Sequence, residues 1–106
     1  MKQRILILLG LAVLCLHSAS AASWQIIASP NGSREANELH GVSALAENDV
    51  WAVGVSYNTE RTLGSTLIEH WNGSRWSVVP SPNPGRNGNE LFGVTSNGAG
   101  AVWAVA

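Results

Sequence analysis

The chain repeats itself at a spacing of 52 residues, and this repeat constrains its fold more than any other feature of the sequence. Residues 24–54 align with residues 76–106 without a gap and share 14 identities in 31 positions. The strongest match is Val50-Trp51-Ala52-Val53, which recurs at positions 102–105. A fixed period near 50 residues is typical of stacked supersecondary units, each of which is too small to bury its apolar face alone.

The first 22 residues have the pattern of a signal peptide. Lys2 and Arg4 give a positive start, an apolar run of 12 residues extends from Ile5 to Leu16, and small residues follow at positions 18–22. This order predicts a secretory leader over residues 1–22 that is removed on export. The apolar run is too short for a transmembrane helix, which needs about 20 residues. We therefore expect residues 23–106 to be secreted or displayed at the cell surface.

The exported part is mildly acidic. It carries four arginines, no lysine and seven acidic residues, which gives a net charge of −3. Without a basic patch it is not expected to bind nucleic acid. The single cysteine, Cys15, lies in the leader, so the exported part has no disulfide. All five tryptophans lie in the exported part, where each can bury a large apolar area.

Short apolar runs alternate with turn signals from Ser23 onward, and no window has the spacing of an amphipathic helix. The pattern predicts an all-β protein with roughly four strands per repeat. Asn72-Gly73 separates two strand-like runs and predicts a tight hairpin, because both residues tolerate a positive φ. The expected strands cover residues 24–28, 39–45, 50–57, 65–71, 75–80, 91–95 and 102–105.

Three segments carry a resemblance to a known family: Asp49–Gly54 (DVWAVG), Thr66–Gly73 (TLIEHWNG) and Trp76–Asn83 (WSVVPSPN). These sequence motifs resemble those of a bacterial family of exported β-propeller repeats, which is distantly similar to kelch and galactose-oxidase central-domain propellers. The resemblance implies a partial β-propeller of antiparallel four-stranded blades, with about 1.6 blades present. The second unit departs from the pattern, with Ala101 in place of Asp49 and Ala106 in place of Gly54.

The two sequence units, 24–75 and 76–106, would make only an incomplete propeller region over residues 23–106. A ring needs about four blades or more. We expect further blades of a longer protein, or self-association, to complete it. The first expected strand, residues 24–28, aligns with residues 76–80, which are expected to form the last strand of a unit. In many propellers the N-terminal strand completes the last blade and so closes the ring, and the order of strands here fits such a closure.

Four residues are candidate ligand contacts: Trp71, Trp76, Glu38 and Glu90. The two tryptophans flank the Asn72-Gly73 turn and would offer aromatic faces to a sugar, or would stabilise the hairpin as a cross-strand pair. The two glutamates recur in Asn-Glu pairs and would line one face of a propeller, where carboxylates bind polar ligands. The alternative is that these Asn-Glu pairs fix loop backbone. We expect no cofactor and assign no catalytic or metal-binding residue.

The two histidines and Asp49 have structural interpretations. His40 aligns with Phe92, so its position accepts a flat ring and favours packing. His70 follows Glu69 in a strand, so the two side chains point to opposite faces. Asp49 is replaced by Ala101 in the second unit and is interpreted as a turn residue.

The function that we expect is an extracellular binding or scaffold module for carbohydrate or protein. One alternative is a fragment of a propeller enzyme, similar to galactose oxidase or sialidase, whose active site lies outside this segment. A second alternative is a structural surface protein.

Overall fold

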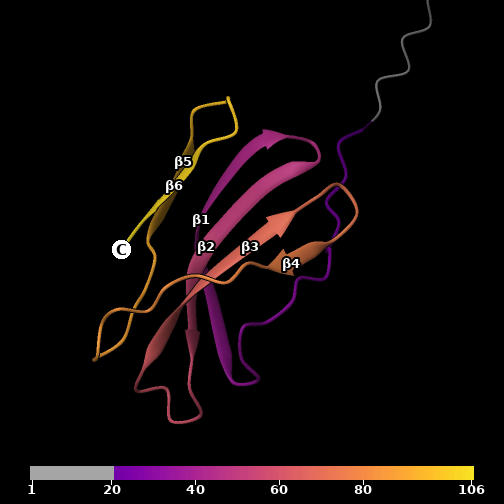
Figure 1. Ribbon diagram of the computed structural model, residues 1–106. Coiled ribbons are helices and arrows are strands. Elements are labelled where there is room, and N and C mark those ends of the chain that lie inside the picture. The colour runs from indigo at the N-terminus through magenta and orange to yellow at the C-terminus, as the bar shows by residue number, and fades with distance from the viewer. Residues whose placement is uncertain (1–20) are drawn as a thin grey trace, which may run out of the picture.

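A computed structural model describes residues 21–106 as an all-β protein (Figure 1). The strands are β1 (Ala36–Ala46), β2 (Asp49–Tyr57), β3 (Gly64–Trp71), β4 (Trp76–Val78), β5 (Gly93–Ser96) and β6 (Val102–Val105). No helix over residues 21–106 is long and apolar enough to cross a membrane. Apart from residues 21 and 22, the expected signal peptide lies outside the part of the chain that the structure describes.

The first four strands form one antiparallel sheet in the order β1-β2-β3-β4. Consecutive strands are neighbours, as expected for a meander whose strands are joined by short turns. The predicted hairpin at Asn72-Gly73 is confirmed between β3 and β4, but its loop has four residues, 72–75, because Trp71 pairs with Trp76. Gly73 has a φ of 96°, whereas Asn72 does not have the positive φ expected of a tight two-residue turn. Instead, the Asn72 side chain accepts hydrogen bonds from the amides of Ser74 and Arg75, both at 3.0 Å. Proline at position 80 follows soon after β4, where a further ladder bond would need an N–H.

A bulge interrupts the pairing of β1 with β2 at His40. Leu39 lies opposite Gly54 and Gly41 lies opposite Val53, so His40 is the extra residue. Gly54 is required at this point because a Cβ there would overlap the carbonyl oxygen of Glu38. The bulge therefore depends on a residue without a side chain at its partner position.

The remaining two strands form a separate hairpin, β5-β6, whose register reproduces that of β1-β2 after a shift of 52 residues. In the first hairpin Gly41 pairs with Val53, Val42 with Ala52, Ser43 with Trp51 and Ala44 with Val50. In the second Gly93 pairs with Val105, Val94 with Ala104, Thr95 with Trp103 and Ser96 with Val102. The sequence repeat is thus also a repeat of strand pairing.

The β5-β6 hairpin packs on one face of the four-stranded sheet, and the segment leading into β1 lies against the other (Figure 1). Trp51 and Val53 point toward the hairpin and share a cavity with Val94 and Ala104. On the opposite face, a Cβ at Gly32 would contact Ser56 and Leu67. The buried apolar core comprises Ala52, Val53, Val55, Leu67 and Leu91.

The strand expected over residues 24–28 is not formed. This segment has no ladder partner among the described residues, and the side chains of Trp24 and Ile26 are fully exposed. Its sequence counterpart, β4, is held by pairing with β3 and through Val79, whose amide donates to the Ile68 carbonyl at 2.8 Å. The same sequence pattern therefore gives a strand only where a neighbouring edge is present to pair with it.

Candidate functional site

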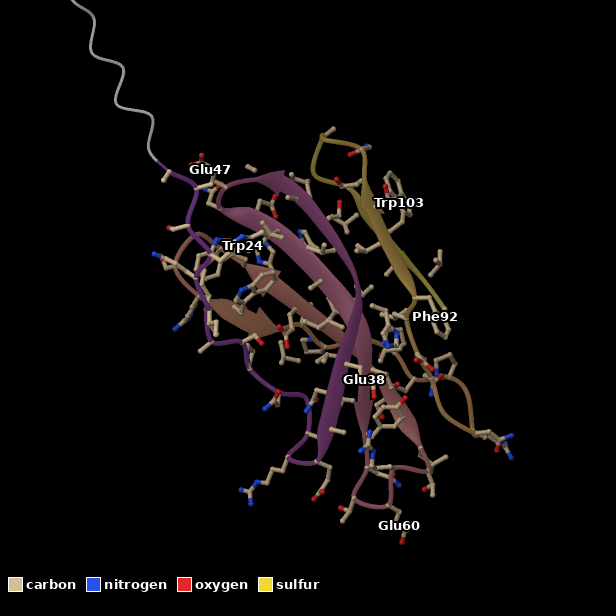
Figure 2. The ribbon with its side chains drawn as sticks, turned by 180° about the vertical axis from the view of Figure 1, so that it is seen from behind. Trp24, Glu38, Glu47, Glu60, Phe92 and Trp103 are labelled. Carbon is tan, nitrogen blue, oxygen red and sulfur yellow. The ribbon has the colours of Figure 1, made fainter. Side chains whose placement is uncertain are left out.

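The four candidate ligand contacts lie in two places rather than one. Trp71 is paired with Val50 near the start of β2, whereas Glu38 is paired with Val55 near its end. Trp71 and Trp76 therefore belong to the hairpin end of the sheet, and Glu38 and Glu90 belong to the opposite end. Figure 2 shows these ends, marked by Glu47 and Glu60.

Trp71 and Trp76 form the cross-strand pair that was one of the two sequence interpretations. Their rings are 5.8 Å apart and inclined at 47°. The Trp71 indole donates to the Glu47 carbonyl at 3.0 Å, which ties the β3-β4 hairpin to the turn between β1 and β2. Both side chains are partly exposed, and their contact helps to hold this end of the sheet together.

His40 has four neighbours, one in its own repeat unit and three in the next. Its Nδ1 donates to the Leu91 carbonyl at 3.1 Å and lies 3.4 Å from Glu90, and its Nε2 lies 3.5 Å from Glu38. The ring stacks on Phe92, with centroids 5.5 Å apart and planes inclined at 12°. The two repeated glutamates are thus brought to opposite sides of one imidazole, at the junction of the units.

The asparagines of the repeated Asn-Glu pairs fix loop backbone, as one sequence interpretation proposed. The Asn37 side chain accepts from the Ser33 amide at 3.1 Å and donates to the Ser33 carbonyl at 3.0 Å. Asn89 makes the same two bonds with Gly85, at 2.7 and 3.0 Å. Ser33 and Gly85 are 52 residues apart, so the clamp is repeated with the strands.

A polar pocket of about 280 Å³ opens beside Glu90, between the β2-β3 loop and the segment before β5. We call it the loop-end pocket. Its lining residues are Tyr57, Thr62, Gly64, Asn87, Gly88, Asn89 and Glu90. The loop on one side is held by Asn58, whose side chain accepts from the amides of Thr62 and Leu63 at 2.9 and 3.2 Å. The pocket wall is therefore organised before any ligand arrives.

Arg61 joins the rim of the loop-end pocket to Glu38. Its Nη2 lies 3.7 Å from the Glu38 carboxylate, and its guanidinium carbon lies 5.8 Å from the centre of the Tyr57 ring. Arg61 has a φ of 54°, a left-handed conformation that non-glycine residues seldom adopt. Partial burial, followed by the charges of Glu38 and Glu90, raises the pKa of Tyr57. The shift is upward from an ordinary value of 10.0, so it favours the protonated hydroxyl, which can donate a hydrogen bond.

The sequence did not point to Tyr57 or Asn87 as lining residues beside Glu90, or to Arg61 as the partner of Glu38. Tyr57 ends β2, Arg61 lies in the β2-β3 loop, and Asn87 lies in the segment between β4 and β5, so β3 and β4 separate them along the chain. Only Glu90 carried a signal, through its repetition as Glu38. Residues that meet through loop geometry leave no spacing pattern in a sequence.

A second polar cluster surrounds Asp49, which begins β2 rather than lying in the preceding turn. One carboxylate oxygen accepts from both the Trp51 indole and His70 Nε2, each at 2.9 Å. The Trp51 and His70 rings are 4.3 Å apart. The carboxylate thus orients two aromatic groups on the face that contacts β5-β6.

Substitution of Asp49 by alanine is expected to lower the free energy of unfolding by about 1–3 kcal/mol, because two partly buried donors lose their acceptor. Urea unfolding followed by tryptophan fluorescence measures this loss. The matched control is Glu47→Ala, which removes an exposed carboxylate in the adjacent turn and keeps the backbone acceptor of Trp71. Equal stability of Asp49→Ala and the parent protein would contradict the assigned role.

Among residues 21–106, Glu69 is the one acidic residue that is buried, with 1% of its surface exposed. Its Oε2 is buried and has no hydrogen-bond partner among residues 21–106. Burial raises the pKa of this carboxyl above its ordinary value. It points away from His70, as strand alternation predicts, so the two do not form an acid–base pair.

Comparison with protein-family models, with curated proteins and with solved structures finds no match to this chain. Within residues 21–106, no three His, Cys, Asp or Glu side chains are grouped so as to hold a metal ion. The site is therefore defined by its own geometry: a small, polar, pre-organised pocket at the junction of two repeat units.

Proposed function

We propose that the chain is part of an exported β-propeller that binds carbohydrate, and that the loop-end pocket receives the sugar. The observation that carries the proposal is the position of this pocket, which lies where the loops of one repeat unit meet the linker to the next. Equivalent loops on one face of stacked units are the usual place for ligand binding in repeat architectures.

The propeller architecture is supported by the way in which the two units meet. The face of the first unit that bears Trp51 contacts the face of the second unit that bears Val94 and Ala104. Trp103, the counterpart of Trp51, lines the opposite face of its own hairpin. The contact is therefore head-to-tail, and head-to-tail contacts generate rings or open helical arrays.

The chemistry of the loop-end pocket favours a carbohydrate over a protein. Its volume of about 280 Å³ suits one sugar residue rather than a protein surface. The Tyr57 hydroxyl offers a donor, Glu90 offers acceptors, and the amide of Asn87 offers both. Such groups match the hydroxyls of a sugar, each of which both donates and accepts.

Binding is tested by NMR titration of the labelled protein with a panel of neutral mono- and oligosaccharides. We expect shifts confined to the loop-end pocket, and a loss of affinity of about five- to tenfold in Tyr57→Phe and in Asn87→Ala, because each removes about one hydrogen bond. Tyr57→Phe keeps the ring under Arg61 and changes only the hydroxyl.

The matched control is Ser77→Ala, a hydroxyl deletion in β4 away from the pocket, which should bind as the parent protein does. Absence of binding across the panel would contradict the proposal. Shifts centred on Trp71 and Trp76, with no effect of Tyr57→Phe, would place the sugar at the other end of the sheet.

A further inference from the structure

The interface between the two units is built from two complementary faces. The first unit contributes Trp51 and Val53, and the second contributes Val94 and Ala104. Hydrogen bonds frame this apolar contact, with the Ser43 and Ser96 hydroxyls 3.3 Å apart and His40 bound to the Leu91 carbonyl. We call the face that bears Trp51 the front face and the face that bears Val94 the back face.

Each unit also has the other face. The front face of the second unit has no cover within residues 21–106, and the back face of the first is covered only in part, where the segment before β1 lies over Ser56 and Leu67. Trp51 and Val53 lie on the front face of the first unit, and their counterparts 52 residues later lie on the front face of the second. These counterparts, Trp103 and Val105, are 52% and 61% exposed. Figure 2 shows Trp103 on the outer side of the β5-β6 hairpin. Val94 lies on the back face of the second unit, and its counterpart 52 residues earlier is Val42 on the back face of the first. Val42 is 69% exposed.

Both of these faces have an open, largely apolar hollow. The outer side of the hairpin has a pocket of about 250 Å³ lined by Gly93, Val94, Thr95, Trp103 and Val105. The first back face has one of about 310 Å³ whose lining includes Leu39, Val42, Ala52 and Trp76. No acidic residue, arginine or lysine lines either pocket, so bringing them together buries no carboxylate, guanidinium or ammonium group from these linings. The one titratable side chain in the linings is His40, in the pocket of the first back face.

We propose that the front face of the second unit docks on the back face of the first unit of another copy of this chain. The contact within the chain is the precedent for this fit, because Trp103 repeats Trp51 and Val42 repeats Val94 in sequence and in strand register. Ile68 of β3 also lines the contact within the chain, and the second unit has no counterpart of β3 within residues 21–106. The segment before β1 lies over Ser56 and Leu67 and leaves Val42 open. The association is heterologous, because the two copies contribute different faces. Each added copy therefore leaves one front face and one back face free, and further copies add until the assembly closes into a ring.

Paired substitutions test the polarity of the contact. Trp103→Arg places a charge on the front face, and Val42→Arg places a charge on the back face. Both native side chains are exposed, so each variant should keep its fold. In sedimentation velocity the parent protein should form species larger than a dimer as concentration rises, and each variant alone should remain monomeric. An equimolar mixture should form a heterodimer and stop there, since one intact front face meets one intact back face.

Thr95→Arg provides a second front-face variant, because Thr95 lies opposite Trp103 in the same hairpin and is exposed. Circular dichroism verifies the fold of every variant. A monomeric parent protein at all concentrations would overturn the proposal, as would a mixture that stays monomeric. Association that survives Val42→Arg would show that the front face accepts unrelated apolar surfaces instead. The loop-end pocket contains none of these residues, so sugar binding and association succeed or fail separately.

Discussion

Replacing Gly54 by alanine is expected to destabilise the four-stranded sheet by more than about 3 kcal/mol, in the range reserved for severe steric conflicts. The added methyl group would overlap the Glu38 carbonyl oxygen and would come within 2.8 Å of the Glu38 carbonyl carbon and of the Leu39 Cα. These are backbone atoms on the paired strand, so no side chain can move aside. The bulge at His40 would have to open, and with it the bond from the Leu91 amide to the Gly54 carbonyl.

The effect is measured by urea unfolding with circular dichroism. Gly93→Ala is the matched control, since its added Cβ would meet only a Val105 methyl group at 3.4 Å, an ordinary contact. We expect Gly93→Ala to change the free energy of unfolding by less than about 1 kcal/mol. If Gly54→Ala were as stable as Gly93→Ala, β1 and β2 could not be paired with the bulge described above.

Substitution of Glu69 by glutamine is expected to stabilise the protein at neutral pH by about 1–3 kcal/mol, because an ionised carboxylate without a partner is costly to bury. Burial raises the Glu69 pKa above its ordinary value of 4.5, so the folded state holds this proton more tightly than the unfolded state does. The contribution of Glu69 to stability is therefore complete below pH 4.5 and is lost as the pH rises through the raised pKa.

The measurement is the free energy of unfolding from pH 4 to pH 8 for the parent protein and for Glu69→Gln. The difference between the two should grow as the pH rises, and the variant should lack that component of the pH slope. Glu60→Gln, in the exposed β2-β3 loop, is the matched control and should follow the parent protein. A difference that shrinks with rising pH would mean that the Glu69 carboxylate has a partner in solution.

The repeat predicted an all-β chain whose strand pairing recurs, because the same side-chain pattern favours the same pairing. Val50–Val53 pairs with residues 41–44 and Val102–Val105 pairs with residues 93–96, so the two hairpins share one register after a shift of 52 residues. The Asn72-Gly73 turn was equally local, since its glycine needs only its own positive φ. The interpretation of His40 as a packing residue was sound in part, because it stacks on Phe92, its own sequence counterpart.

The sequence failed where the outcome depends on what lies next to a segment. Residues 24–28 have the composition of a strand, but a strand forms only against a partner edge, and none is present for them within residues 21–106. Asp49 was judged by its loss in the second unit, whereas its role depends on His70, which is far along the chain. The loop-end pocket joins Tyr57 to Asn87 through loop conformation, for which no periodicity exists.

Nuclear Overhauser effects from the Trp51 indole test most directly whether the units stack head to tail. The arrangement predicts cross-peaks from the Trp51 ring to the methyl groups of Val94, Val102 and Ala104, with which it shares a cavity. In dilute monomer the Trp103 ring should show contacts to Gly93 and Thr95 of its own hairpin and none to Val53 or Ile68. Cross-peaks from Trp103, rather than Trp51, to the methyl groups of Val53 and Ile68 would contradict the stacking of the two units.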